Sequence, residues 1–274
     1  MRAALLDGID EADYLWLQAL LKAGRQASLA SVQQAEERLA PLLWRRHVPG
    51  FGGLMRILRE EPDGLLADEV LDRLASAGGW FFHDPHPCQL LRAHALTALA
   101  ASRAESRRLR LWSVACGLGQ EPYSLALLLE HAMPQLKGWD INILATDASG
   151  GALARAREGA YGRDEVGRGL PLSLLTRYFE QQGLRWVLQA QVRRLVEFRP
   201  LRLEGVWDGL ERMDLILLRN VMAGLDGPER SRLVRRAAAQ LNPGGWLVLE
   251  PQDEVGPVAG LTRVETPHGQ AWRA

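Results

Sequence analysis

Residues 111–124 run from an apolar, strand-like segment through a turn of small residues into the start of an apolar helix. Gly117 and Gly119 lie in the turn, and Glu121 and Pro122 follow where a helix would begin. A strand, a tight glycine turn and a helix in this order form one unit of a parallel sheet that often holds a nucleotide-like ligand. The turn lacks the third glycine of the dinucleotide fingerprint, so these residues alone fit a ligand site and a plain tight turn equally well.

The second half of the chain alternates between strand and helix patterns. Such alternation predicts βαβ units and an α/β fold with a doubly wound parallel sheet. Residues 161–195 interrupt this alternation, and we expect them to form a small insertion at one edge of the site. We expect residues 261–273 to form a closing hairpin. The predicted strands are 111–115, 141–146, 196–200, 215–218 and 246–250, the predicted helices are 122–131, 150–158 and 228–240, and a turn is predicted at 242–245.

The first part of the chain has a different pattern. Leucines recur at helical spacing through residues 10–75, Ser31 is placed to cap a second helix, and residues 49–53 are expected to be a break. We therefore expect a small all-helical domain with its linker over residues 1–92, followed by the α/β domain over residues 93–274.

The charge of the chain is balanced, with 33 basic and 33 acidic residues among 274. A net charge of zero gives no general attraction for nucleic acid or an anionic membrane. Cys88 and Cys116 do not make a disulfide framework, and no apolar stretch approaches the ~20 residues of a membrane span. The first ten residues lack the apolar core of a signal peptide. We therefore expect a cytoplasmic protein without a metal site that neither binds nucleic acid nor inserts into a membrane.

Polar residues follow the predicted strands where ligands of parallel sheets bind. Asp147 ends the second strand and is placed either to accept hydrogen bonds from ribose hydroxyls or to cap the next helix. Glu121 is favoured by the helix dipole whatever its function, and it is also placed to pair with a ligand ammonium group. Arg219 and Asn220 follow another apolar strand and are either ligand contacts or an ordinary polar loop.

At these positions the chain resembles the CheR family of chemoreceptor glutamate methyltransferases, which use S-adenosylmethionine. The most specific stretches are Gly119–Leu125, Ala145–Asp147 with Ala154–Tyr161, and Arg219–Met222. Weaker matches are Phe81–Phe82, Arg177–Phe179 and Leu241–Gly245, and together these segments extend over nearly the whole chain.

The resemblance implies a Rossmann-like S-adenosylmethionine methyltransferase domain behind a helical domain, with S-adenosylhomocysteine as the product. The partner would be a chemoreceptor or a related signalling protein, contacted by the helical domain and by the insertion around residues 167–191. Arginines of the helical domain either face an acidic receptor helix or form ordinary solvated faces; they are Arg38, Arg45, Arg46, Arg56 and Arg59. The implied cofactor contacts are Ala115, Gly117 and Glu121 for the methionine part, Asp147 for the ribose, and Asn220 and Val221 for the pocket lining.

Several positions depart from the family pattern. His83 stands where the family has an arginine, and it is either the candidate catalytic residue, since a protonated imidazole can bind the substrate carboxylate, or an ordinary loop histidine beside Asp84. Arg202 replaces an asparagine near the adenine, where it either stacks on the base or fills the pocket. Gly224 replaces a tyrosine, Gln120 replaces the first glutamate of the turn, residues 76–80 lack the usual cofactor-contacting threonine, and residues 250–254 replace a Gly-His-Ser-Glu-like run.

The predicted function is methylation of glutamate side chains on a chemoreceptor or a related signalling protein. A carboxylate with a reference pKa near ~4.3 is ionised at neutral pH, so it requires no general base. The departures remove residues that align and bind the substrate carboxylate. They remove no general acid or general base. A catalytically weakened relative that senses the cofactor or binds a signalling protein is the alternative.

Overall fold

The computed structural model describes residues 8–25, 29, 31–62, 64–75, 81–82, 85–167, 169–222, 225–251, 253 and 255–274. The chain forms two compact units, Met1–Ala77 and Gly78–Ala274, each described by itself below. The units divide at Ala77 and Gly78, not at residue 92. The reason is that apolar residues from Leu90 to Leu99 belong to the core of the second unit.

The first unit is helical in its described part. Leucine-rich faces of its helices form one core, in which Leu17, Leu39 and Leu58 are fully buried. The expected break at residues 49–53 is wrong, because Gly50 has a positive φ of 76° and starts a helix directly after Pro49. The helices are α1 (Glu11–Arg25), α2 (Val32–Arg46), α3 (Gly50–Glu60) and α4 (Leu65–Ala75).

The second unit is built on a seven-stranded sheet with the strand order β6-β2-β1-β7-β8-β10-β9. The first five of these strands are parallel, and β10 and β9 add the expected antiparallel hairpin. The strands are β1 (Arg108–Val114), β2 (Asp140–Asp147), β6 (Val196–Pro200), β7 (Met213–Leu218), β8 (Leu241–Leu249), β9 (Thr262–Thr266) and β10 (Gly269–Arg273).

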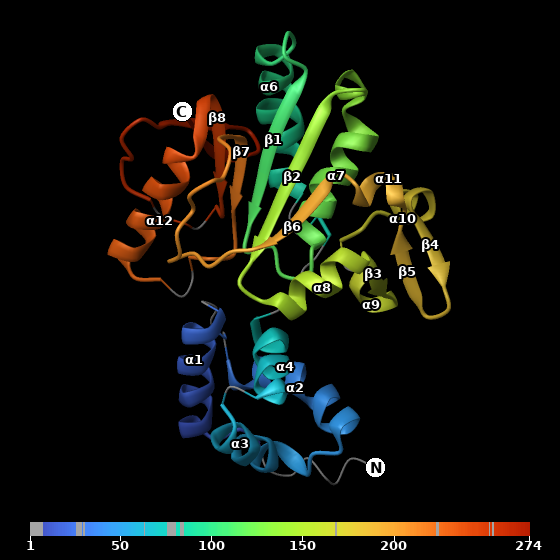
Figure 1. The fold of residues 1–274 in the computed structure, drawn as a ribbon, viewed down its shortest axis with the longest axis vertical. Helices are drawn as coiled ribbons and strands as arrows, with labels where there is room; N and C mark the ends of the chain where they lie inside the picture. The colour runs from blue at the N-terminus through green and yellow to red at the C-terminus, as the bar shows by residue number, and fades with distance from the viewer. Residues whose placement is uncertain are drawn as a thin grey trace. The chain divides into compact units, whose positions relative to one another are not determined.

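Both faces of this sheet are covered, because consecutive strand residues enter different cores. Leu111 joins a core with helices α6 and α7, whereas Trp112 joins a core with helix α12. Figure 1 shows β1 and β2 at the centre, with α12 beside β7 and β8. The helices are α5 (Pro85–Leu90), the π-helix η1 (Leu91–Ala95), α6 (Leu96–Ser102), α7 (Gln120–Ala132), the 3-10 turn η2 (Pro134–Leu136), α8 (Gly150–Glu158) and α12 (Gly227–Ala239).

The interruption after α8 is a small subdomain around a three-stranded antiparallel sheet with the order β3-β5-β4. Gly169 has a φ of 81°, and a Cβ there would collide with the carbonyl oxygen of Phe81. This close approach holds the subdomain against the Phe81–Phe82 segment. The elements are β3 (Ala160–Gly162), α9 (Arg163–Val166), α10 (Leu172–Tyr178), β4 (Phe179–Gln182), β5 (Arg185–Leu188) and α11 (Ala190–Arg193).

The predicted turn at residues 242–245 lies inside β8. The register between β7 and β8 shifts between Met213 and Leu215, which accommodates the glycines within the strand. The backbone N–H of Gly244 donates to the carbonyl of Ala274 at 2.8 Å, so the segment also pairs with the C-terminal residue of the chain. No helix in the described part of the chain has the length and apolarity needed to span a membrane.

Candidate cofactor site

The turn after β1 carries an unusual series of left-handed backbone conformations. The φ angles are 53° at Ala115, 54° at Gly117 and 90° at Gly119. The backbone N–H of Cys116 donates to the carbonyl of Thr146 on β2 at 2.9 Å, which holds the turn against the neighbouring strand. The turn therefore lies at the carboxyl ends of β1 and β2, directly before α7, where parallel sheets bind ligands.

The two turn glycines have different surroundings. A Cβ on Gly119 would lie 3.0 Å from the Cβ of Ala156 and 3.2 Å from the hydroxyl of Tyr161, so this glycine is required for packing. A Cβ on Gly117 would meet no heavy atom within 4 Å. The hydroxyl of Tyr161 also donates to the carbonyl of Leu118 at 2.8 Å, which fixes the back of the turn. Gly117 therefore marks the open side of the turn.

Asp147 interacts with the turn and does not cap the following helix. Its Oδ2 accepts the backbone N–H of Gly117 at 2.8 Å, and its Oδ1 accepts the N–H of Ser149 at 2.8 Å. The N-cap of α8 is Ser149, whose hydroxyl oxygen accepts the N–H of Ala152 at 3.0 Å. Asp147 thus connects the end of β2 to the backbone of the glycine turn and to the start of α8.

A buried cluster of charges lies at the ends of β7 and β8 and the start of α7. Arg219 Nη1 lies 3.5 Å from Glu121 Oε2, and Arg219 Nη2 lies 3.1 Å from Glu250 Oε1. The side chains of Arg219 and Glu250 are 8% and 7% exposed. The hydroxyl of Ser113 at the end of β1 donates to Glu121 Oε1 at 2.7 Å. We call Glu121, Arg219 and Glu250 the charge cluster.

Burial is the largest cause of the raised pKa values of Glu121 and Cys116. It raises the pKa of Glu121 above its ordinary value, and the opposing effects of Arg219 and the Ser113 hydroxyl only partly compensate. Burial also opposes the charge of Arg219, but the two glutamates together raise the pKa of its guanidinium. The pKa of Cys116 is raised by burial and by Asp147 and Glu121, which favours the protonated thiol.

Several buried polar atoms of this region lack a hydrogen-bond partner in the described part of the chain. They are both side-chain amide atoms of Gln120, which is 1% exposed, Nε of Arg219 and Oε1 of Glu250. Buried polar groups are normally satisfied, so such a concentration fits a site completed by a polar ligand.

The other predicted site residues lie around this region or outside the described residues. Asn220 follows Arg219 with a φ of 60°, and Val221 is buried. Arg202 is exposed, so it does not fill a buried pocket in this structure. His83 and Gly224 lie outside the described residues, as do residues 76–80. Beside them, the N–H of Phe82 donates to the Ser124 hydroxyl at 3.0 Å, which fixes that segment on α7.

Sequence reasoning missed Ser113 and the role of Glu250. Ser113 is a polar residue inside an apolar strand, which was a usable signal because buried hydroxyls need a partner. Glu250 was noted only as a departure at the end of the last parallel strand. Its partner Arg219 is 31 residues earlier in the chain.

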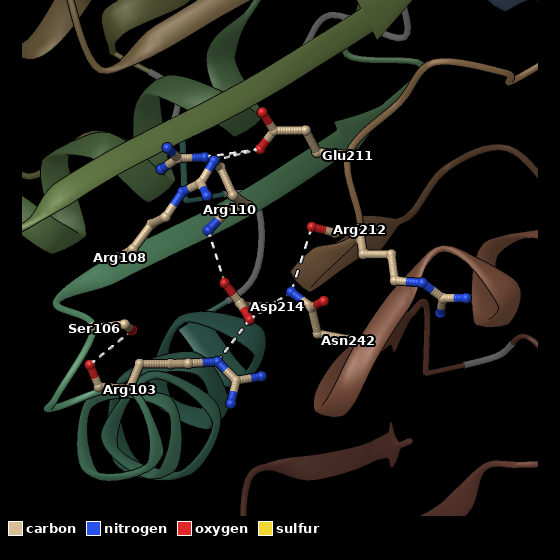
Figure 2. Close-up of a pocket in the computed structure, with 8 residues that line it drawn as sticks. All are labelled: Arg103, Ser106, Arg108, Arg110, Glu211, Arg212, Asp214 and Asn242. Carbon is tan, nitrogen blue, oxygen red and sulfur yellow. Dashed lines mark hydrogen bonds and ion pairs between the residues drawn. The ribbon is translucent and has the colours of Figure 1, made fainter.

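A cavity of about 420 Å³ lies at the opposite edge of the sheet, at the amino ends of β1, β7 and β8 (Figure 2). Asp214 occupies its centre and accepts bonds of 2.9 Å from Arg103 Nε, from the Arg110 N–H and from Asn242 Nδ2. Glu211 lies 2.8 Å from Arg108 and 3.2 Å from Arg110. The carboxylates engage three of the arginines lining this cavity, and its polar network ties α6 to three strands.

Residues 79–265 match the family model described as the CheR methyltransferase, SAM binding domain. This match covers more than half of the 274 residues. The chain belongs to the CheR methyltransferase family. This CheR methyltransferase therefore uses S-adenosylmethionine as its methyl donor, and the predicted fold class is confirmed.

Curated relatives agree with this family. Chemotaxis protein methyltransferase 1 of Pseudomonas aeruginosa is 33% identical over 217 residues, which are 77% of this chain and 78% of the relative. Chemotaxis protein methyltransferase 1 of Vibrio cholerae is 31% identical over 228 residues, which are 82% and 81% of the two chains. A solved amino pentose methyltransferase of Micromonospora echinaspora with bound S-adenosylmethionine is 20% identical, with coverages of 63% and 57% and a TM-score of 0.33. The family assignment rests on the sequence matches.

Proposed function

We propose that this CheR methyltransferase methylates glutamate side chains on a chemoreceptor or a related chemotaxis signalling protein. The observation that carries the proposal is the joining of the open glycine turn to Asp147 and to the charge cluster at one edge of the sheet. The relatives named chemotaxis protein methyltransferases support the pathway. The catalytically weakened alternative is not favoured by this membership.

The proposed cofactor-binding residues form groups according to the part of the cofactor that each would hold. Ala115, Gly117 and Glu121 would hold the methionine part, since a turn backbone and a carboxylate suit an amino acid. Asp147 would accept the ribose hydroxyls, and the exposed guanidinium of Arg202 would stack on the adenine. Asn220 and Val221 would line the pocket between these parts.

The bound S-adenosylmethionine supplies an electrophilic methyl group on a positively charged sulfur. The substrate glutamate is an ionised carboxylate at neutral pH and needs no general base. The protein's task is to hold that carboxylate in line with the methyl group and to exclude water. His83 would bind the carboxylate when its ring is protonated.

Contacts of the helical unit bear on receptor binding. Arg45 and Arg46 pair with Glu69, and Arg59 lies 2.6 Å from Asp13. These arginines are therefore engaged within the unit. Arg56 is exposed, and we propose that it contributes to an acidic partner's binding more than the paired arginines do.

The test is transfer of a labelled methyl group from S-adenosylmethionine to cytoplasmic fragments of chemoreceptors. Glutamate methyl esters are labile to base, so the label should be released as methanol on alkaline treatment. The variant Asp147→Asn serves as the cofactor-site control and should transfer far less label. If the protein binds S-adenosylhomocysteine but transfers no base-labile label to any receptor fragment, the substrate proposal is wrong and the sensing role gains support.

A further inference from the structure

Glu250 is a buried acidic residue that the cofactor contacts implied by the family resemblance do not include. It lies directly after β8 at the first position of the stretch that replaces the Gly-His-Ser-Glu-like run. Its side chain is 7% exposed, and its Oε2 accepts a hydrogen bond from Arg219 Nη2 at 3.4 Å, whereas its Oε1 lies 3.1 Å from the same nitrogen without the geometry of a hydrogen bond. A buried carboxylate held mainly by one shared guanidinium is costly unless a further cation completes it.

The charge cluster has one more carboxylate than guanidinium. Glu121 and Glu250 both face Arg219, so the ionised cluster carries one excess negative charge. Among the described residues, Arg219 is the cation within ion-pair distance of Glu121 and Glu250. Asp253 Oδ2 accepts the Glu250 N–H at 3.2 Å and is itself acidic, and the arginine that affects it, Arg230, donates its Nε to the Leu225 carbonyl instead.

The turn beside the cluster feels the same negative charge. The buried Cys116 thiol is influenced by both Asp147 and Glu121, which act together against its ionisation. Asp147 and Glu121 thus act on the turn that carries the open side of Gly117, with Arg157 acting in the opposite sense, and Arg219 is shared between Glu121 and Glu250. The site is suited to a ligand with net positive charge.

The methyl donor and the product differ in charge by one unit. Both carry an ammonium and a carboxylate, so these groups contribute equally to the two affinities. The donor also carries a sulfonium, whereas the product has a neutral thioether. We propose that Glu250 is a specificity-determining residue that shifts the binding preference of the site toward the charged donor and away from the neutral product. This inference rests on the proposed cofactor site.

The test compares two unreactive ligands by calorimetry. Sinefungin carries an amine in place of the methylated sulfonium and is positively charged there, and S-adenosylhomocysteine is neutral at that position. At an effective dielectric constant of ~20, removing a unit charge about 12 Å from a cation changes that cation's affinity by about tenfold, and removing a closer charge changes it by more. We expect Glu250→Gln to lower the ratio of sinefungin affinity to S-adenosylhomocysteine affinity about tenfold, with the latter affinity changing less than about threefold.

Two further variants make the result specific. Glu250→Asp keeps the charge and should retain most of the ratio, even if its shorter side chain costs stability. Glu197→Gln removes a half-buried glutamate on β6, outside the charge cluster, and should leave the ratio unchanged. The proposal is wrong if Glu250→Gln lowers the affinities for both ligands equally. It is also wrong if Glu250→Asp lowers the ratio of sinefungin affinity to S-adenosylhomocysteine affinity as much as Glu250→Gln does. If the wild-type protein binds neither ligand, the cofactor-site proposal itself fails.

Discussion

The backbone N–H of Gly117 lies 2.8 Å from Oδ2 of Asp147, so the end of β2 holds the glycine turn that follows β1. The other carboxylate oxygen accepts the N–H of Ser149 at 2.8 Å. One side chain thus fixes the backbone of the turn and of the helix start beyond β2. The same carboxylate is the group that we propose accepts the ribose hydroxyls, which would link the shape of the turn to ligand binding.

The variant Asp147→Asn should lose both stability and cofactor affinity. An asparagine places an N–H₂ group where one of the two backbone N–H donors now finds an acceptor. Hydrogen bonds to charged groups contribute roughly 1.5–3 kcal/mol, so we expect the free energy of unfolding to fall by about that amount. We expect S-adenosylhomocysteine affinity to fall at least roughly tenfold, measured by calorimetry on the folded variant.

A matched control lies at the other end of the same strand. Asp140 begins β2, is 66% exposed and pairs with Arg110 at 2.6 Å. Exposed ion pairs contribute about 0–1 kcal/mol, so Asp140→Asn should change stability slightly and leave ligand affinity unchanged. Equal losses of affinity in both variants would mean that Asp147 acts through the strand and makes no direct ligand contact.

The two turn glycines should respond differently to alanine. Gly119→Ala combines a left-handed backbone with a Cβ 3.0 Å from the Cβ of Ala156, and we expect a loss of about 2–4 kcal/mol of unfolding free energy. Gly117→Ala adds a methyl group to open space, so it should cost about 1–2 kcal/mol but weaken ligand binding strongly. Denaturant unfolding and calorimetry separate the two effects, and tight ligand binding by Gly117→Ala would remove Gly117 from the site.

The parallel strands were predictable because their apolar runs are short and sit between helical patterns, and each predicted strand overlaps an observed one. Two features could not be predicted from the sequence: the start of α3 at Gly50, and the inclusion of residues 242–245 in β8. Both depend on positive φ angles, at Gly50 and at Gly244, that only the surrounding packing selects. The sequence also left Asp147 open as the cap of α8, whereas the observed N-cap is Ser149.

The sequence predicts where the site lies in the fold better than it predicts which residues contact one another there. Residues that follow strands along the chain, such as Asp147 and Asn220, were found because strand ends mark the ligand edge of a parallel sheet. The charge cluster was not assembled from the sequence, because Glu121, Arg219 and Glu250 come from three separate βα segments. Their meeting depends on the strand order, in which β1, β7 and β8 are neighbours.

Arg202 should contribute modestly to adenine binding. The side chain is exposed, and its Trp207 neighbour donates the indole N–H to the Arg202 carbonyl at 3.4 Å. Stacking of an exposed guanidinium on an aromatic ring contributes about 0.5–1 kcal/mol, so Arg202→Ala should weaken S-adenosylhomocysteine binding roughly two- to fivefold. Tighter binding by Arg202→Ala would show instead that the arginine excludes the cofactor.

Changing His83 to arginine should raise methyl transfer, and more so at higher pH. A histidine with a pKa near ~6.5 is mostly neutral at pH 7.5, whereas arginine remains charged. We expect the ratio of the His83→Arg rate to the wild-type rate to be near one at pH 6 and to rise toward roughly tenfold at pH 7.5. A pH-independent ratio would mean that His83 does not bind the substrate through its charge.

Glu121 should make the stability of the ligand-free protein depend on pH. Burial raises its pKa above the ordinary value of 4.5, so between these two values the folded state binds more protons than the unfolded state. Its contribution to the free energy of unfolding is therefore fully present below pH 4.5 and is lost as the pH rises through the folded-state pKa. The wild-type protein should lose stability relative to Glu121→Gln across this window, measured as the difference in melting temperature at each pH. The same variant should bind S-adenosylhomocysteine more weakly at neutral pH, because the carboxylate that is costly in the empty site is the one proposed to hold the ligand ammonium. A constant difference in melting temperature would show that Glu121 titrates alike in the folded and unfolded chains.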